Sequence, residues 1–440
     1  MTQDGWLAAT TGRPLVARRY FGAWLVLLAT LPLGLYRYYT NPDIGLLTWQ
    51  VGESTSGAYM GINYHVYHVA AERVLAGEPF YGVAPDPATG NFVYLYPPVT
   101  VTGFLPFGSL DWTTGYLVFT FLSLCGALAA TVVVVRYVES LGTPLGWLDL
   151  ALVFGLFALS IHVSATVYFG NINVLLGLAF AVGFWALRQG RERAAGTAFG
   201  IAALFKLFPA LVGLWLLRDR RLEATAAAIG TGVAGLLAGI ALFGVDTTVH
   251  FFRTVVPNRS DSAAFVGGLP ADGPFYVTVQ RPLSHLLWGL WPEAPYPLLP
   301  ASAALVCGAT LAAFYRRIET ERDRLMAIFA TVVVTLVAVP SFRLYAPLLF
   351  LPLVALLYTW TAGPGRRLFL AGGLLFSVVA RPRHVLTASE YLGPLEAPVA
   401  AAGRVVTVQL LAYGVMVAAC GWHLHSGNGT PPDGRSEFEG

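Results

Sequence analysis

Apolar runs as long as a bilayer is thick recur along this sequence and constrain its fold more than any other feature. Only 12% of the residues are charged, which is too few to cover the surface of a soluble protein of this size. A helix needs about 20 apolar residues to cross a membrane, so the sequence predicts an all-α polytopic membrane protein, one domain over residues 1–424 with about 10–12 transmembrane helices. The apolar runs are 21–38, 112–135, 147–168, 172–187, 195–217, 223–245, 297–315, 325–340, 344–360, 368–380 and 405–423, with a short run at 98–107.

Composition excludes several classes of function. A net charge of +3 is too small to indicate a nucleic-acid partner. The three cysteines lie in apolar runs at unrelated spacings, which fits neither a disulfide framework nor a zinc site. The sequence lacks a glycine-rich loop of the kind that cradles nucleotide phosphates, so a nucleotide sugar is not the expected donor. We expect no cofactor and no metal.

Arginine-rich turns set the orientation, because cytoplasmic loops carry an excess of Lys and Arg. If residues 1–20 are cytoplasmic, the turns "RQGRER", "RDRR", "RRIETERDR" and "GPGRR" should be cytoplasmic too. Two of these turns flank the run 195–217, which therefore cannot be a simple crossing. Its centre reads "FKLFP", and we expect two half-helices that enter and leave on the same side. The run 98–107 has prolines at both ends and is too short to span, so we expect it to be interfacial or re-entrant.

About ten crossings place both termini in the cytoplasm and two long loops, 39–111 and 246–296, outside the cell membrane. In an alternative with twelve crossings, the runs 98–107 and 195–217 both span the membrane and "RQGRER" lies outside. The first run lacks a small-residue cleavage site, so we expect a retained span and not a signal peptide. Both loops are rich in aromatic residues, in which disordered segments are poor, and we expect them to be ordered and to wall a cavity. The Gly- and Pro-rich tail 425–440 is expected to be disordered and cytoplasmic.

Four sequence motifs follow one another between about residues 20 and 380. The first comprises "NYHVYHVAAERVLAGEPFY" and "FVYLYPPV", and the second runs from "YFGNINVLLG" through "FKLFP" to "RDRR". The motifs "QRPLSHLL" (280–287) and "PSFRLYAPLLFLP" (340–352) come after them. In this order, the motifs resemble glycosyltransferase family 87, the polyprenol-phosphate-mannose-dependent mannosyltransferases.

The resemblance implies a GT-C fold and an inverting sugar transfer at the extracytoplasmic face. A hexose, expected to be mannose, passes from a polyprenyl-phosphate donor to a glycolipid or glycan acceptor in the cell envelope. Such a transfer needs a base that takes the acceptor hydroxyl proton and positive groups that hold the departing phosphate. The implied partners are this donor, this acceptor and membrane lipid.

Asn63 stands where the resemblance places the catalytic acid. An amide has no useful basicity, and three explanations remain open. The chain carries an Asp-to-Asn change that leaves it slow or inactive; or His65, His68 or a nearby acid is the base; or the family is right and the mapping of the base is wrong. The nearby acids are Asp43, Glu53 and Glu78.

His65, His68 and Glu72 share one face of the predicted helix, at i, i+3 and i+7. Two histidines and a carboxylate can bind a transition metal, but no further cluster of Cys or acids supports a metal site. The simplest alternative is the polar face of an interfacial helix. We also consider that the histidines line the substrate site, since imidazole offers a donor and an acceptor to sugar hydroxyls.

Lys206 is the only lysine in the sequence and lies in the middle of an apolar run. An ionised group in such a run usually marks a functional site, here a contact with the carrier phosphate; the alternative is a side chain that reaches an interface. Arg343 is a second phosphate candidate, since a guanidinium can hold two phosphate oxygens. Asn171 and Asn173 open a helix and either contact substrate or cap it. The other predicted substrate contacts are Tyr67, Glu78, Tyr81, Tyr96, Gln280, Arg281 and Tyr345.

Two other functions stay open. A secondary transporter or lipid flippase is also polytopic and contains broken helices, but it should show paired half-repeats, and "FKLFP" has no matching partner. A non-catalytic protein that binds a polyprenyl-phosphate sugar fits the amide at position 63.

Overall fold

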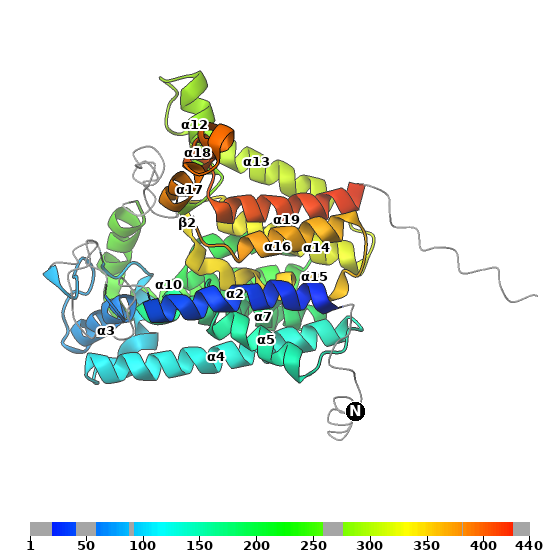
Figure 1. Ribbon diagram of the computed structural model, residues 1–440. Helices are drawn as coiled ribbons and strands as arrows, with labels where there is room; N and C mark the ends of the chain where they lie inside the picture. Colours follow the sequence, from blue (N-terminus) through cyan, green and yellow to red (C-terminus); the bar gives the residue numbers. More distant parts are fainter. Residues whose placement is uncertain (1–19, 41–58, 88–91, 258–275, 381, 426–440) are drawn as a thin grey trace, which may run out of the picture.

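The computed structural model describes residues 20–40, 59–87, 92–257, 276–380 and 382–425. This part of the chain is helical, apart from two short antiparallel strands, and most of its long helices lie roughly parallel in one bundle (Figure 1). The elements of the first half are α2 (Phe21–Thr40), α3 (Ile62–Leu75), η3 (Pro98–Phe107), α4 (Trp112–Ser140), α5 (Trp147–Ala158), α6 (Ser164–Phe169), α7 (Asn173–Arg188), α8 (Glu192–Phe205), η4 (Phe208–Val212), α9 (Gly213–Arg218), α10 (Leu222–His250) and η5 (Phe251–Val255). Those of the second half are β1 (Tyr276–Val277), α12 (Gln280–Leu290), α13 (Leu298–Tyr315), α14 (Glu321–Val337), β2 (Ser341–Phe342), η7 (Arg343–Leu349), α15 (Phe350–Thr359), α16 (Pro364–Phe376), α17 (Pro382–Ser389), η8 (Gly393–Leu395), α18 (Glu396–Val405) and α19 (Val408–His425).

Three helices of the described chain are long and apolar enough to cross a membrane: α4, α10 continued by η5, and α13. A fourth results if η8–α18 and α19, which are bent by 87°, count as one broken span. Shorter apolar helices, among them α2, α5 and α7, account for several of the other apolar runs. The prediction of an all-α polytopic protein is confirmed, whereas the number of crossings stays a prediction.

The predicted run 147–168 is not one helix, because α2 packs against a break at 159–163. The Ile161 amide donates a 3.0 Å hydrogen bond to a carbonyl of α2. A Cβ on Gly34 of α2 would lie 2.1 Å from the Leu159 carbonyl oxygen, so the two backbones are in direct contact. A tertiary contact thus accompanies the interruption of this run, at a point where the sequence "LSIHV" carries two polar residues, Ser160 and His162.

The arginine-rich turns meet at one end of the bundle, which we call the arginine end. The start of α2 and the end of α19 lie there as well, on the right in Figure 1. The arginine-rich turns thus share one end of the bundle with the start of α2 and the end of α19, while the membrane face to which this end belongs stays a prediction. The contacts that define this end are Arg188–Glu321 (3.3 Å), Arg221–Glu192 (3.0 Å), Arg324–Asp219 (3.3 Å), Tyr20 Oη to the Pro144 carbonyl (3.1 Å), Arg317 to the Leu424 carbonyl (3.4 Å) and the rings of Trp360 and His423 (5.2 Å).

The run 195–217 forms a re-entrant hairpin, made of α8, η4 and α9. α8 starts at the arginine end and runs parallel to α10, since Gly196 and then Gly200 abut α10 at successive points along it. The chain leaves the helix at Lys206 (φ −140°, ψ 123°), and Pro209 has no N–H with which to continue it. α9 then leads back to the "RDRR" turn at the arginine end. Both ends of this segment lie at the arginine end, as a hairpin requires, while its entry into a membrane from one side stays a prediction.

The opposite end of the bundle, which we call the outer end, carries α3 and η3 (Figure 1, left). The run 98–107 is a short 3₁₀-helix that packs on α3 and on α10, where a Cβ on Gly239 would lie 3.3 Å from the Val99 nitrogen. Tyr64 and Tyr67 of α3 are fully buried. The first loop was expected to be folded and not disordered. This is confirmed for 59–87 and 92–111, while 41–58 and 88–91 lie outside the described residues.

The second loop starts later than the sequence indicates. The first part of α10 ends in a kink at Gly244, whose φ of 83° and ψ of 164° are not helical, so the predicted end of the run at 245 coincides with this break. Beyond the kink, a second helical segment continues to His250 and η5 to Val255. Glycine adopts a positive φ without strain. The hydroxyl of Thr247 then donates to the carbonyl four residues before it and supports the continued turn. The predicted tail 425–440 lies outside the described residues except for its first residue.

We expect Asp219→Asn to destabilise the arginine end. Asp219 is only 14% exposed and lies 2.7 Å from the Arg221 Nε and 3.3 Å from an Arg324 nitrogen. An amide would leave Arg324 without this counter-charge and Arg221 with Glu192 alone, at a cost of about 1–3 kcal/mol. Thermal unfolding of the purified protein in detergent should show a lower midpoint.

Glu223→Gln is the matched control for this prediction. Glu223 pairs with Arg193 at 3.2 Å, but both side chains are mostly exposed, and such pairs contribute about 0–1 kcal/mol. Equal midpoints for the two variants would contradict the structural role assigned to Asp219.

Candidate active site

Lys206 lies at the tip of the re-entrant hairpin, facing the outer end. Its Nζ donates a 2.9 Å hydrogen bond to the Tyr96 hydroxyl. The same nitrogen lies 4.5 Å from the ring centre of Tyr96 and 5.3 Å from that of Tyr345, distances at which a cation is attracted to an aromatic face. The hairpin therefore holds the ammonium group against phenols.

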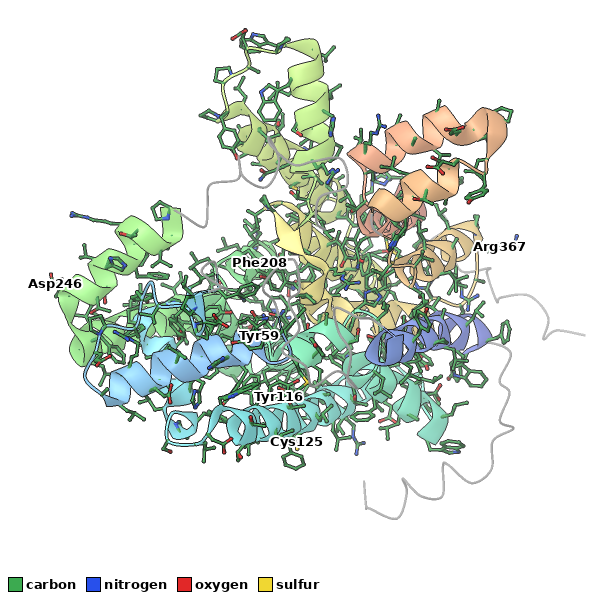
Figure 2. The ribbon with its side chains drawn as sticks, turned by 60° about the vertical axis from the view of Figure 1, so that its left-hand side comes forward. Tyr59, Tyr116, Cys125, Phe208, Asp246 and Arg367 are labelled. Atoms are coloured by element: carbon green, nitrogen blue, oxygen red, sulfur yellow. The ribbon has the colours of Figure 1, made fainter. Side chains whose placement is uncertain are left out.

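The phenols around Lys206 form a connected set, and we call Lys206, Tyr67, Tyr96 and Tyr345 the lysine–tyrosine cluster. The hydroxyls of Tyr67 and Tyr96 are 3.0 Å apart, and Phe208 packs on Tyr345 with ring centres 4.8 Å apart. Figure 2 labels Phe208, which is partly buried, near the centre of the view. Burial raises the pKa of Tyr67, so its phenol stays protonated and can donate a hydrogen bond. The sequence predicted all four members of the cluster as substrate contacts.

Asn171 and Asn173, at the start of α7, lie beside this cluster. Tyr67 hydrogen bonds to the backbone of Ile172, between the two asparagines. Asn173 is fully buried, and neither its Oδ1 nor its Nδ2 has a hydrogen-bond partner among the described residues; the same holds for the Oδ1 of Asn171. No side chain caps α7 at Ile172, so the asparagines do not serve as the cap that the sequence left open. Buried polar atoms without partners call for a ligand or water.

Asn63 lies in the first turn of α3, one helical turn before Tyr67. Residues four apart share a helix face, so Asn63 is on the side of α3 that carries Tyr67. Its side chain is half-buried and forms no hydrogen bond with the described residues. The position predicted for the catalytic acid is therefore next to the lysine–tyrosine cluster.

The two histidines of α3 point to the other side of the helix. His68 Nε2 lies 2.8 Å from the Leu110 carbonyl, to which only an N–H can donate. His65 packs on Trp112, with ring centres 5.1 Å apart, and its Nδ1 lies 2.5 Å from the Tyr59 hydroxyl. The structure thus does not bring the predicted catalytic histidines together with Tyr67 and Lys206.

The protonation of His65 follows from this packing. Burial, and to a smaller extent the charge of Asp86, raises the pKa of Tyr59 to about 12, so its hydroxyl donates to His65 Nδ1. The imidazole proton then resides on Nε2. Burial, with His68 nearby, lowers the pKa of His65 to about 4. Neutral His65 consequently has no free lone pair and is a poor base. Asp86 itself is an acid near this region that no sequence motif marks.

The spacing of His65, His68 and Glu72 raised the possibility of a metal site. His68 Nδ1 lies 3.4 Å from a carboxylate oxygen of Glu72, but without hydrogen-bond geometry. Within the described ranges, no three His, Cys, Asp or Glu side chains are grouped as a metal ion would require. This face of α3 instead packs on the segment that leads into α4.

The predicted contacts of the later motifs lie apart from the lysine–tyrosine cluster, except for Tyr345. Gln280 Nε2 donates to the Ala338 carbonyl at 3.0 Å, and Arg281 Nε donates to the Arg404 carbonyl at 3.0 Å. These bonds fix the start of α12 to the end of α14 and to α18. Arg343, two residues before Tyr345, lines a small pocket together with Val277, Thr407 and Gln409.

Glu78 and Tyr81 lie in the turn that follows α3. Tyr81 Oη donates a 2.6 Å hydrogen bond to the Tyr96 carbonyl, which ties this turn to the lysine–tyrosine cluster. Glu78 pairs with Arg73 at 3.2 Å. Both residues line a larger cleft against α10, together with Asp246 and further residues of α10 that no sequence motif singled out.

Comparisons with known proteins show to which family the chain is similar. The sequence model of glycosyltransferase family 87 matches residues 94–342. No curated protein matches the chain. Among solved structures, ArnT from Cupriavidus metallidurans bound to undecaprenyl phosphate is similar at 15% sequence identity and a TM-score of 0.34, over 96% of this chain and 78% of that chain.

The family match contains Tyr96, both asparagines and Lys206, and it begins after Asn63. The assignment of Asn63 to the catalytic acid position therefore stays a prediction. Since more than half of its 440 residues match, the chain belongs to glycosyltransferase family 87 and is a membrane glycosyltransferase.

Proposed function

We propose that this protein transfers a hexose, in the first place mannose, from a polyprenyl-phosphate donor to a lipid- or glycan-linked acceptor at the extracytoplasmic face of the cell membrane. The observation that carries this proposal is the position of Lys206. The only lysine of the chain lies at the tip of a re-entrant hairpin, 2.9 Å from the Tyr96 hydroxyl and at the end away from the arginine-rich turns. Since arginine-rich turns are typical of the cytoplasmic side, Lys206 faces the extracytoplasmic side and both termini are cytoplasmic.

The donor phosphate binds at Lys206 in this proposal. A polyprenyl chain stays in the hydrocarbon while its sugar phosphate lies at the interface, and an ammonium group there attracts the phosphate as a point charge. The hydroxyls of Tyr67 and Tyr96 add hydrogen bonds to phosphate or sugar oxygens. The buried amides of Asn171 and Asn173 can hydrogen bond to the sugar hydroxyls.

The reaction is an inverting displacement at the anomeric carbon. An acceptor hydroxyl oxygen forms a bond to this carbon, the bond from the carbon to the phosphate oxygen breaks, and the phosphate leaves with the electron pair. Lys206 stabilises the negative charge that develops on the leaving phosphate. A base takes the hydroxyl proton, and the position on the Tyr67 face of α3 where an acid would do so holds Asn63. Transfer by the natural chain is therefore slow, or it uses another carboxylate of the outer end.

Replacing Lys206 tests the phosphate contact. Lys206→Met keeps the length of the side chain and removes its charge, and we expect kcat/KM for polyprenyl-phosphate mannose to fall about 10²–10³-fold. Lys206→Arg, the matched control, keeps the charge and should lose less. Initial rates in proteoliposomes measure both, and an unchanged rate for Lys206→Met would exclude the phosphate contact.

Restoring an acid at position 63 tests the base. We expect Asn63→Asp to raise the rate of mannose transfer about 10²–10⁴-fold, because a carboxylate can accept the hydroxyl proton. If the natural chain transfers mannose and Asn63→Asp transfers it at the same rate, the base is another residue. If neither form transfers sugar from any lipid-linked donor, the enzymatic proposal fails.

Asn63 also favours a second candidate, a non-catalytic protein that binds the lipid-linked sugar. An amide in place of an acid leaves the hydrogen-bonding cluster intact and removes only the basic group. Saturable binding of the donor that depends on Lys206, without turnover by either form, would distinguish this candidate from an enzyme.

A further inference from the structure

A cleft at the outer end lies between the turn that follows α3 and the last turns of α10. Its volume is about 630 Å³, within the range of roughly 300–1,000 Å³ that is usual for small-molecule sites. Figure 2 labels Asp246 at the outer edge of α10, far in that view from the label of Phe208. The cleft is thus separate from the lysine–tyrosine cluster.

Aromatic rings and hydrogen-bonding side chains line the cleft together. Phe80 of the turn packs edge-on against Phe243 of α10, with ring centres 5.6 Å apart, and the Tyr81 ring lies 5.7 Å from that of His250. Sugar rings combine apolar C–H faces, which pack on aromatic rings, with hydroxyls, which donate to carboxylates and bond to imidazole. The polar groups of the lining include Glu78, Asp246, Thr247 and His250.

The charge of the cleft opposes an anionic ligand. Glu78 is paired with Arg73, while Asp246 forms no ion pair with any described residue. A negative lining repels phosphate, so the cleft does not suit the sugar phosphate of the donor. A neutral ligand with many hydroxyls fits it better.

The wall that α10 contributes also faces the membrane. Only 11% of its span is buried within the protein, and large apolar side chains remain exposed beside the cleft. A ligand in the cleft can therefore keep a hydrocarbon tail in the bilayer, as a glycolipid does. The exposed apolar residues next to the cleft are Leu242, Val245 and Val249.

One residue joins the cleft to the lysine–tyrosine cluster. Tyr81, in the wall of the cleft, donates a 2.6 Å hydrogen bond to the carbonyl of Tyr96, whose hydroxyl accepts from Lys206 at 2.9 Å. A sugar in the cleft is thus one residue away from the place where the donor phosphate is proposed to bind. This short distance between the cleft and Lys206 suits the acceptor of a sugar transfer, which has to lie close to the donor.

We propose that the cleft between the α3 turn and α10 binds the neutral sugar headgroup of a membrane-anchored glycolipid acceptor. This inference rests on the proposed function. In it, Asp246 and His250 hold sugar hydroxyls, Tyr81 packs on a sugar ring, and the acyl chains lie along the exposed face of α10.

The test is a binding titration of the full chain in lipid nanodiscs with methyl α-mannoside, followed by saturation-transfer NMR. The double variant Asp246→Asn, His250→Ala removes the charge and the imidazole at exposed positions, where folding is not at risk. We expect its affinity for methyl α-mannoside to be about tenfold lower than that of the wild type, as for the loss of a hydrogen bond to a charged group. Mannose 1-phosphate should not displace the sugar at equal concentration.

Glu293→Gln is the matched control, because Glu293 is an exposed carboxylate outside the cleft. It should bind methyl α-mannoside as the wild type does. Equal affinities of the wild type and the double variant, an equal loss in the control, or no binding by the wild type would each overturn the proposal. So would displacement of methyl α-mannoside from the wild type by an equal concentration of mannose 1-phosphate.

This readout does not depend on turnover. If no form of the protein transfers sugar but the cleft variants still weaken binding of the neutral sugar, the enzymatic proposal fails and the cleft remains a sugar site. If transfer proceeds and the cleft variants change neither binding nor the KM for a glycolipid acceptor, the assignment of the cleft fails alone.

Discussion

The hydrogen bond from Lys206 to Tyr96 joins the two parts on which the site depends. An ammonium group within an apolar run is costly unless polar groups surround it. The partners of Lys206 come from the segment after α3 and from the start of η7, while the hairpin brings in the charge itself. Neither the membrane-embedded helices nor the outer segments form this cluster alone, so the outer end has to fold onto the bundle for the site to exist.

The hairpin can present its charge at the outer end because both of its limbs are fixed at the other. Arg221 bonds to Glu192 at the start of α8 and to Asp219 just after α9, and Arg324 extends the network to α14. Partly buried groups with several partners resist separation more than single exposed pairs do. The arginines at this end therefore hold the hairpin in place, twelve or more residues away from the lysine that it carries.

Sequence reasoning found the lysine–tyrosine cluster because each signal was local. A lone charge in an apolar run, flanked by two basic turns, implied the hairpin, and the family motifs supplied the tyrosines. Helix periodicity also put His65 and His68 on one face, but it could not tell that this face meets Trp112. The break at 159–163 depends on packing with α2, a contact between distant segments that helix periodicity does not show. The outer wall of the cleft is the helical segment that follows the kink at Gly244, and this segment lies beyond the end of the apolar run at 245.

Charge separates the two proposed ligands at the outer end. In the two proposals, the donor phosphate binds at Lys206, whereas the cleft, which carries carboxylates, takes a neutral sugar. Either ligand in the wrong place would bring like charges together or leave a charge without a partner, which costs free energy. The layer formed by Tyr81, Tyr94 and Tyr96, whose rings lie 5.4–6.0 Å apart, stands between the two regions. Because these side chains are neutral and largely buried, they keep the two fields apart while they leave hydroxyls for hydrogen bonds with either sugar. In these proposals, electrostatics therefore decides which substrate binds at Lys206 and which binds in the cleft. This selection does not require a detailed fit to a particular sugar.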